Sequence, residues 1–133
     1  MPGLRNLITD VPGIRVGNAH DETLASGVTV ALFEEPVVAS GLALGGAPAH
    51  RDAACLEPEM AVERVNAVVL SGGSGFGLDA ASGVQAWMRE RGIGIEVGRM
   101  HVPVVPHGCG QEGIPLSGLR GCFKIIKPIF SRV

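Results

Sequence analysis

Apolar runs and turn residues alternate along the first part of the chain and predict a β-rich beginning. The β-branched run at residues 27–33 and the apolar run at residues 37–44 each favour a strand. Because only three turn-forming residues separate them, we expect the two runs to form a β-hairpin. The polar stretch at residues 18–26 predicts a loop, and residues 14–16 ahead of it form a short apolar piece.

The middle of the chain predicts two helices with a strand and a loop between them. Pro58 suits the first turn of a short helix that ends near Val65, because proline has no amide proton to leave unpaired there. Residues 67–70 are fully apolar and predict a brief strand, which a glycine-rich loop at residues 71–77 follows. Residues 78–91 form the strongest predicted helix.

The pattern at residues 78–91 also predicts where that helix ends. Ala81, Val84 and Met88 recur at spacings of three and four, and Gly92 stands where a C′ cap belongs. Residues 93–97 and 102–105 again have strand character. Strands and helices therefore alternate along the chain, and we expect a mixed α/β (α+β) fold.

Composition favours a folded protein that binds neither nucleic acid nor a membrane. Hydrophobic residues make up 46% of the chain, enough for a packed core, and charged residues only 18%, too few for a disordered chain. A net charge of −2 creates no field that would attract nucleic acid or an anionic membrane surface. The apolar stretch at residues 36–49 is too short to cross a bilayer, and glycines interrupt it.

The cysteines and the N-terminal residues favour a cytoplasmic location. Cys55, Cys109 and Cys122 are an odd number at unrelated spacings, so they predict no disulfide framework. Asp10 and Pro12 interrupt the apolar run that a secretory signal requires.

Charge changes abruptly after Pro106. Residues 1–106 hold seven arginines, no lysine and 12 acidic residues, a net charge of −5. Residues 107–133 hold four basic residues and one acidic residue, Glu112, a net charge of +3. One interpretation is that this segment is a basic arm on an acidic domain. The other is that the chain departs here from a longer parent protein, by truncation or a change of reading frame. Composition alone favours the arm.

The glycine-rich segment is the main candidate binding site, and its residues are Gly72, Gly73, Ser74, Gly75 and Phe76. Glycines let a ligand approach main-chain N–H groups, and the start of the following helix favours negative charge. The segment therefore suits a phosphate, a carboxylate or a developing oxyanion. It matches neither the dinucleotide-binding pattern nor the nucleophile elbow. A tight strand-to-helix connection without a ligand explains the same residues equally well.

Spacing alone assigns no catalytic residue. Ser71, Ser74 and Ser82 are the hydroxyls nearest the glycine-rich segment, but a catalytic serine needs a base within hydrogen-bond reach. No histidine is near in sequence, and only the fold could bring His20 or His50 close. We therefore expect these hydroxyls to cap helices and to bond loops.

Spacing also assigns no metal ligands. Four nitrogen and sulfur side chains form a loose set without the short paired spacing of structural zinc sites: His101, His107, Cys109 and Cys122. Cys55 follows His50 by five residues, as a thiol and its base could, but a small buried cysteine is the more usual outcome. We expect no metal.

The sequence ERVNAVVLSGGSGFGLDAASGV at residues 63–84 is the most specific of several stretches that together resemble one family. The other stretches lie, in order and without large gaps, at residues 6–21, 27–40, 45–48 and 91–106. Together they resemble the L-aminopeptidase/D-amino-acid esterase-amidase family. It is also called DmpA-like, and it includes β-peptidyl aminopeptidases and nylon-oligomer hydrolases.

The resemblance implies an N-terminal-nucleophile hydrolase with a four-layer α-β-β-α fold of the DmpA/ornithine-acetyltransferase type. In such proteins the precursor cuts itself, and the N-terminal Ser or Thr of the new β chain is the nucleophile. The implied substrates are short peptides, amino-acid amides and esters, without a metal or organic cofactor. The implied assembly is a homo-oligomer, and the glycine-rich segment at residues 72–77 is expected to line the substrate cleft.

The resemblance stops where the charge changes. We expect residues 1–106 to be the N-terminal part of the hydrolase α chain and residues 107–133 to be a divergent basic tail, so the layered fold would be truncated. The tail is expected to contribute little to the core from His107 onward. Because the cleavage junction, the nucleophile and the oxyanion Asn match no residue here, we expect a chain that is inactive unless the missing remainder of the hydrolase is supplied. Two alternatives stay open: a small module that binds an anion or another ligand through the glycine-rich loop, and a structural or assembly protein.

Overall fold

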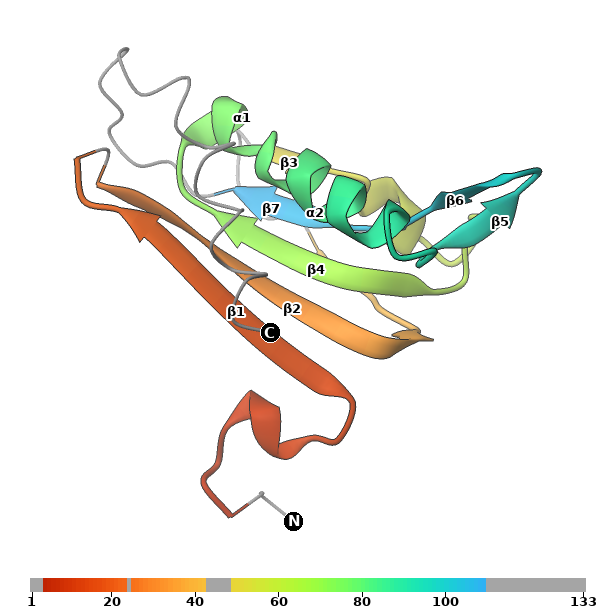
Figure 1. Cartoon of the computed structure of the whole chain (residues 1–133), viewed down its shortest axis with the longest axis horizontal. Coiled ribbons are helices and arrows are strands. Elements are labelled where there is room, and N and C mark those ends of the chain that lie inside the picture. The colour runs from red at the N-terminus through yellow and green to blue at the C-terminus, as the bar shows by residue number, and fades with distance from the viewer. Residues whose placement is uncertain (1–3, 24, 43–48, 110–133) are drawn as a thin grey trace.

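A five-stranded mixed sheet with the two α-helices on one face forms the body of the protein (Figure 1). The computed structural model describes residues 4–23, 25–42 and 49–109. The elements, in chain order, are η1 (Ile8–Asp10), β1 (Ile14–Asp21), β2 (Ser26–Val37), β3 (Ala49–Arg51), η2 (Ala53–Leu56), β4 (Val65–Ser71), α1 (Ser74–Gly77), α2 (Ala80–Arg89), β5 (Ile95–Val97), β6 (Met100–Val102) and β7 (His107–Cys109). These elements confirm the predicted α+β class.

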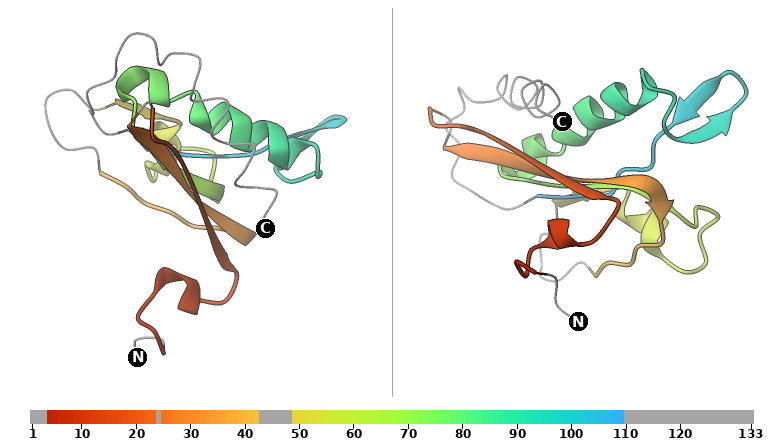
Figure 2. Two further views of the ribbon diagram at one scale, coloured as in Figure 1. Left: turned by 60° about the vertical axis from the view of Figure 1, so that its left-hand side comes forward. Right: turned by 60° about the horizontal axis from the view of Figure 1, so that its bottom comes forward.

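The order of strands in the large sheet is β1-β2-β4-β7-β3, while β5 and β6 form a separate hairpin. β2 pairs antiparallel with both β1 and β4, and β7 pairs parallel with β4 and antiparallel with β3. Figure 2 shows α2 along one face of this sheet and η1 beyond the other face.

The predicted hairpin between residues 27–33 and 37–44 is wrong. β2 runs without a turn from Ser26 to Val37, and its hairpin partner is β1, in a register from Ile14 opposite Phe33 to Asp21 opposite Ser26. Pro36 is accommodated because the pairing of β2 with β4 shifts register between Leu32 and Val37, and proline is tolerated at such irregular positions.

β1 also corrects the loop predicted at residues 18–26. The strand continues through Asn18 to Asp21, because β2 supplies a continuous antiparallel partner for these polar residues. β1 lies at the edge of the described sheet, so polar side chains such as Asn18 and His20 stay exposed to solvent.

The core lies between the sheet and α2. Alternate residues of β2 and β4 face the helix, and they pack against its apolar stripe together with Val105: Val28, Val30, Leu32, Ala67, Val69, Ala80, Ala81, Val84 and Met88. Burying one large aliphatic side chain contributes about 1.5–3 kcal/mol. This one face therefore supplies most of the apolar burial of the described chain.

The predicted helix at residues 78–91 is present but shorter. α2 spans Ala80–Arg89 and ends as the sequence predicts, with Gly92 at a φ of +68°. The amide of Gly92 donates to Arg89 O, and the amide of Ile93 donates to Met88 O, which is the Schellman pattern. The predicted loop at residues 71–77 is partly wrong, because Ser74–Gly77 forms a single helical turn, α1.

Two further predictions around α2 need correction. No helix begins at Pro58; the described chain instead has the short helix η2 (Ala53–Leu56) followed by a turn. The strand predicted at residues 102–105 is displaced, since β6 ends at Val102 while Val104 and Val105 are buried outside any strand. The strand predicted at residues 67–70 is confirmed within β4.

The expectation that the chain contributes little to the core from His107 onward is wrong for its first three residues. His107–Cys109 forms β7, which lies between β4 and β3, and the His107 side chain is only 2% exposed. The remaining tail residues, 110–133, lie outside the described part of the chain. Across the described ranges, no helix has both the length and the apolar character needed to cross a membrane.

Candidate functional site

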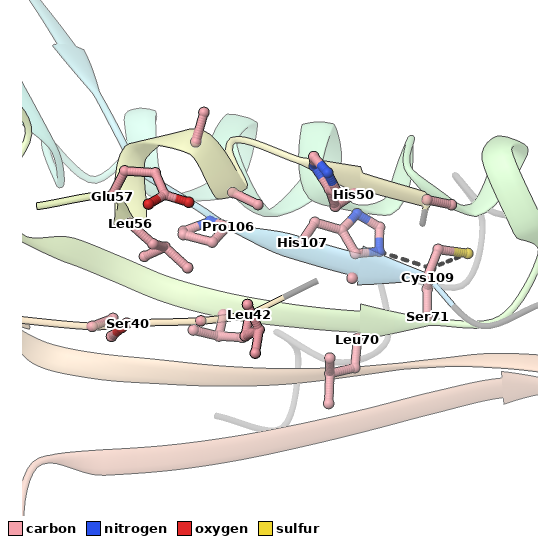
Figure 3. A pocket seen from close by; sticks show the side chains of 17 residues that line it. Ser40, Leu42, His50, Leu56, Glu57, Leu70, Ser71, Pro106, His107 and Cys109 are labelled. Carbon is pink, nitrogen blue, oxygen red and sulfur yellow. Dashed lines mark hydrogen bonds between the residues drawn. The ribbon is translucent and has the colours of Figure 1, made fainter. Parts of the chain in front are cut away.

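A cavity of about 700 Å³ lies against β4, β7 and β3 (Figure 3). Gly108 of β7 lies opposite Leu70 of β4 on one side and opposite His50 of β3 on the other. The side chains of Leu70 and His50 therefore point to the face of the sheet away from α2. Gly108 has no side chain, and this leaves a depression between Leu70 and His50 as part of the cavity floor. The rim is formed by residues 39–42 and by residues around η2, including Leu42, Leu56 and Glu57.

Ser71, His107 and Cys109 also border this cavity, but their side chains meet on the α2 side of the sheet, where the parallel strands β4 and β7 finish. Ser71 Oγ lies 2.8 Å from His107 Nε2 and 3.5 Å from Cys109 Sγ. The pairing of β4 with β7 sets Val69 opposite His107 and Ser71 opposite Cys109, so these side chains share one face of the sheet.

The hydrogen bonds of His107 determine its tautomer. Nδ1 lies 3.3 Å from the Leu78 carbonyl oxygen, which only accepts, so Nδ1 carries the proton of the neutral ring. Nε2 is then the acceptor for the Ser71 hydroxyl. Burial lowers the pKa of His107, the bond to Leu78 opposes this shift, and the positive charge of Arg51 adds to it. The neutral ring therefore predominates at pH 7.

The three side chains fasten the glycine-rich turn to the sheet. The Cys109 thiol donates to Ser74 O at 2.7 Å, and the Ser71 hydroxyl also lies 3.1 Å from Gly77 O. Leu78 O accepts from His107 Nδ1, so two carbonyl groups of this segment accept hydrogen bonds from side chains of β7, while the single Ser71 hydroxyl proton is donated to His107 Nε2. A Cβ on Gly77 would lie only 2.8 Å from both Ser71 Oγ and Cys109 Sγ, so the turn packs directly on this cluster.

Ser71 and His107 have the separation of a nucleophile and its general base. The packing of Gly77 against Ser71 Oγ nevertheless leaves little room for a reacting carbonyl at that oxygen. The arrangement is thus a hydrogen-bonded clamp, as the sequence predicts for the hydroxyls of this segment. The sequence names His20 and His50 as candidate bases and misses His107, because only the pairing of β4 with β7 brings His107 to Ser71.

The five residues predicted to bind substrate do not share one cavity. Gly72 lines a cavity of about 400 Å³ beside β1 and β2, and Gly75 and Phe76 line another of about 230 Å³ beside Arg51. None of the five, Gly73 and Ser74 included, lines the 700 Å³ cavity, although the adjacent Ser71 does. Their role in binding remains a prediction.

The other candidate groups are not brought together as a set. His50 lines the large cavity, whereas Cys55 does not. His101 lies on β6, beside a different cavity from His107 and Cys109. Cys122 lies outside the described residues. In the described ranges, no three His, Cys, Asp or Glu side chains form a group that could hold a metal ion.

Most of this chain is similar in sequence to known proteins. The model of peptidase family S58 matches residues 6–111. Proteins described as uncharacterized aminopeptidases in Mycobacterium bovis and Mycobacterium tuberculosis H37Rv are each 42% identical over 121 residues, which cover 85% of this chain and 35% of each relative. A Mycobacterium leprae protein of the same description is 41% identical over 109 residues, covering 76% of this chain and 30% of its own length. This chain therefore spans about a third of the length of the curated relatives it matches.

Proposed function

Because the chain belongs to peptidase family S58, we propose that it is the N-terminal part of the α chain of a self-processing aminopeptidase or amidase. The match of the family over residues 6–111 is the observation that carries the proposal. The relatives, which bear the name aminopeptidase, support a peptidase-type activity.

The proposed substrates are short peptides, amino-acid amides and amino-acid esters. The large cavity suits such ligands, because its lining includes the apolar side chains of Leu42 and Leu70 and the polar groups of His50 and Glu57. Leu70 is 58% exposed, so the described chain leaves apolar surface available to a ligand or to further protein at this face.

The chemistry is proposed to come from an N-terminal Ser or Thr that self-cleavage exposes, with its own α-amine as base. Ser71 has no free α-amine, and its hydroxyl is held by His107 and packed under Gly77. We therefore assign no catalytic residue to the described chain. By itself the chain is proposed to be inactive, and its proposed partners are the remainder of the hydrolase and further copies of itself, in the cytoplasm.

The test compares this chain with a chimera in which residues 1–109 are joined to the segment that follows the matched region in the Mycobacterium bovis relative. Both are assayed with amino-acid p-nitroanilides, β-alanyl amides and D-alanine esters. We expect no turnover by the chain alone and, from the chimera, turnover of about 1 per second or faster. Turnover by the chain alone that Ser71→Ala or Ser74→Ala abolishes would contradict the proposal.

A further inference from the structure

A cavity of about 230 Å³ lies on the α2 side of the sheet, and it is lined by Arg51, Gly75, Phe76, Leu78 and Asp79. Arg51 belongs to β3, and the other four residues belong to α1 and the turn that leads into α2. Because Arg51 pairs with His107, whose ring contacts Leu78 O, its side chain leaves the sheet on the helix side. The 700 Å³ cavity has His50 and Leu70 on the opposite side.

The guanidinium group of Arg51 donates hydrogen bonds to two neutral side chains, and its other N–H groups take no part in these two bonds. Nη1 donates to Ser82 Oγ at 2.6 Å, and Nη2 donates to Gln85 Oε1 at 2.8 Å. Arginine has five N–H donors, so these two bonds leave three. Ion pairs in the described part of the chain join Arg15 to Glu34 and Arg91 to Glu90, and none involves Arg51. Among the described residues, no carboxylate therefore forms an ion pair with this positive charge.

Asp79 lines the same cavity with the opposite charge. Its carboxylate accepts only a long hydrogen bond of 3.4 Å, from Ser82 Oγ, and it forms no ion pair within the described ranges. A second carboxylate is near, because Asp52 Oδ2 accepts from the Nε2 of Gln85 at 3.3 Å. A simple anion at Arg51 would therefore meet two negative charges as well as one positive charge. A ligand that carries both signs is favoured instead.

We propose that this cavity binds a small α-amino acid in its zwitterionic form. The carboxylate pairs with the free donors of Arg51, and such pairs are frequently bidentate. The ammonium group pairs with Asp79, and the ligand's side chain rests on the ring of Phe76, which is 59% exposed. Drug-sized ligands occupy cavities of about 300–1,000 Å³, so this smaller volume suits a small amino acid such as alanine. This inference does not depend on the proposed hydrolytic function.

The test measures binding of three ligands of similar size to the full chain by calorimetry. L-alanine carries both charges, propionate lacks the ammonium group and ethylamine lacks the carboxylate. We expect L-alanine to bind at least tenfold more tightly than either of the others, and Asp79→Asn to remove that advantage. Equal affinities for the three ligands, or an unchanged affinity in Asp79→Asn, would overturn the proposal.

Two further variants keep the test decisive, because Arg51→Gln also removes two internal hydrogen bonds and can fail to fold. A Cβ at Gly75 meets nothing within 4 Å, so Gly75→Ala adds a methyl group to the cavity wall without a clash. We expect this variant to keep or raise its unfolding midpoint and to bind L-alanine at least threefold more weakly. Leu42→Ala, at the rim of the 700 Å³ cavity, should keep the original affinity. The reverse pattern would place the ligand in the larger cavity and overturn the proposal.

Discussion

Ser71 Oγ lies 2.8 Å from His107 Nε2, although 36 positions separate the two residues in the chain. The parallel pairing of β4 with β7 creates this contact, and the bond from His107 Nδ1 to Leu78 O fixes the ring. The same pair that resembles a nucleophile and its base therefore attaches the glycine-rich turn to the sheet.

Ser71→Ala should destabilise the fold by about 1–3 kcal/mol, because it leaves the buried Nε2 of His107 without its hydroxyl donor. The free energy of unfolding, measured by urea titration, checks this. Ser40→Ala is the matched control, since Ser40 is exposed, and should change stability by no more than about 0.5 kcal/mol. Equal effects of the two substitutions would mean that the Ser71–His107 bond contributes nothing.

Stability should decrease as the pH is lowered through the range in which His107 takes up a proton. Its pKa in the folded protein is lowered, chiefly by burial, so the unfolded chain binds the proton more readily. The contribution is complete above the unfolded pKa of about 6.5, and it is lost as the pH falls through the lower folded pKa. Urea titrations across this interval should show a slope that His107→Gln removes and that His20→Gln, at an exposed position, retains. An identical slope in His107→Gln would refute this assignment.

Gly77→Ala should destabilise the protein by about 1–3 kcal/mol, the usual cost of overpacking. The added Cβ would lie 2.8 Å from both Ser71 Oγ and Cys109 Sγ, and it would also clash with Gly72 O. Gly75→Ala, in the same helical turn, meets nothing within 4 Å and should be neutral or stabilising by up to about 1 kcal/mol. The thermal unfolding midpoints of the two variants, measured side by side, distinguish steric crowding from helix propensity, because only crowding lowers the midpoint of Gly77→Ala and not that of Gly75→Ala.

Met88→Ala should cost about 2–5 kcal/mol, because Met88 is fully buried between α2 and the sheet and its truncation leaves a cavity. Met60→Ala is the control of matched chemistry, since Met60 is 44% exposed and lies outside the core. Denaturant unfolding measures both. A loss below about 1 kcal/mol for Met88→Ala would mean that the core closes around the missing side chain.

Helix α2 and strand β4 could be predicted from the sequence because their signals are local. The apolar spacing of Ala81, Val84 and Met88 identifies the helix, and Gly92 supplies the positive φ that ends it. Strand β4 contains the predicted apolar run at residues 67–70. Each of these features depends on residues within a few positions of one another.

The predictions failed where strand partners decide the structure. Residues 34–36 resemble a turn, yet they continue β2 because β4 accepts a shifted register there. The polar residues of β1 resemble a loop, yet β2 pairs with them along the whole strand. His107 resembles the start of a tail, yet it is buried between two strands. Strand pairing joins residues that are distant in sequence, so no local pattern specifies it.

The sequence by itself determined the α+β class, the position of the main helix and its cap, and the resemblance to a hydrolase family, because each rests on the order of residues along the chain. Only the tertiary structure decided that Ser71 meets His107, that Arg51 and Asp79 line one cavity, and that Leu70 and His50 flank another. These contacts arise when the parallel pairing of β4 with β7 and the antiparallel pairing of β3 with β7 bring distant side chains to one place. The physical reason is that a side chain acts through its neighbours in space, and strand register, not sequence spacing, selects those neighbours.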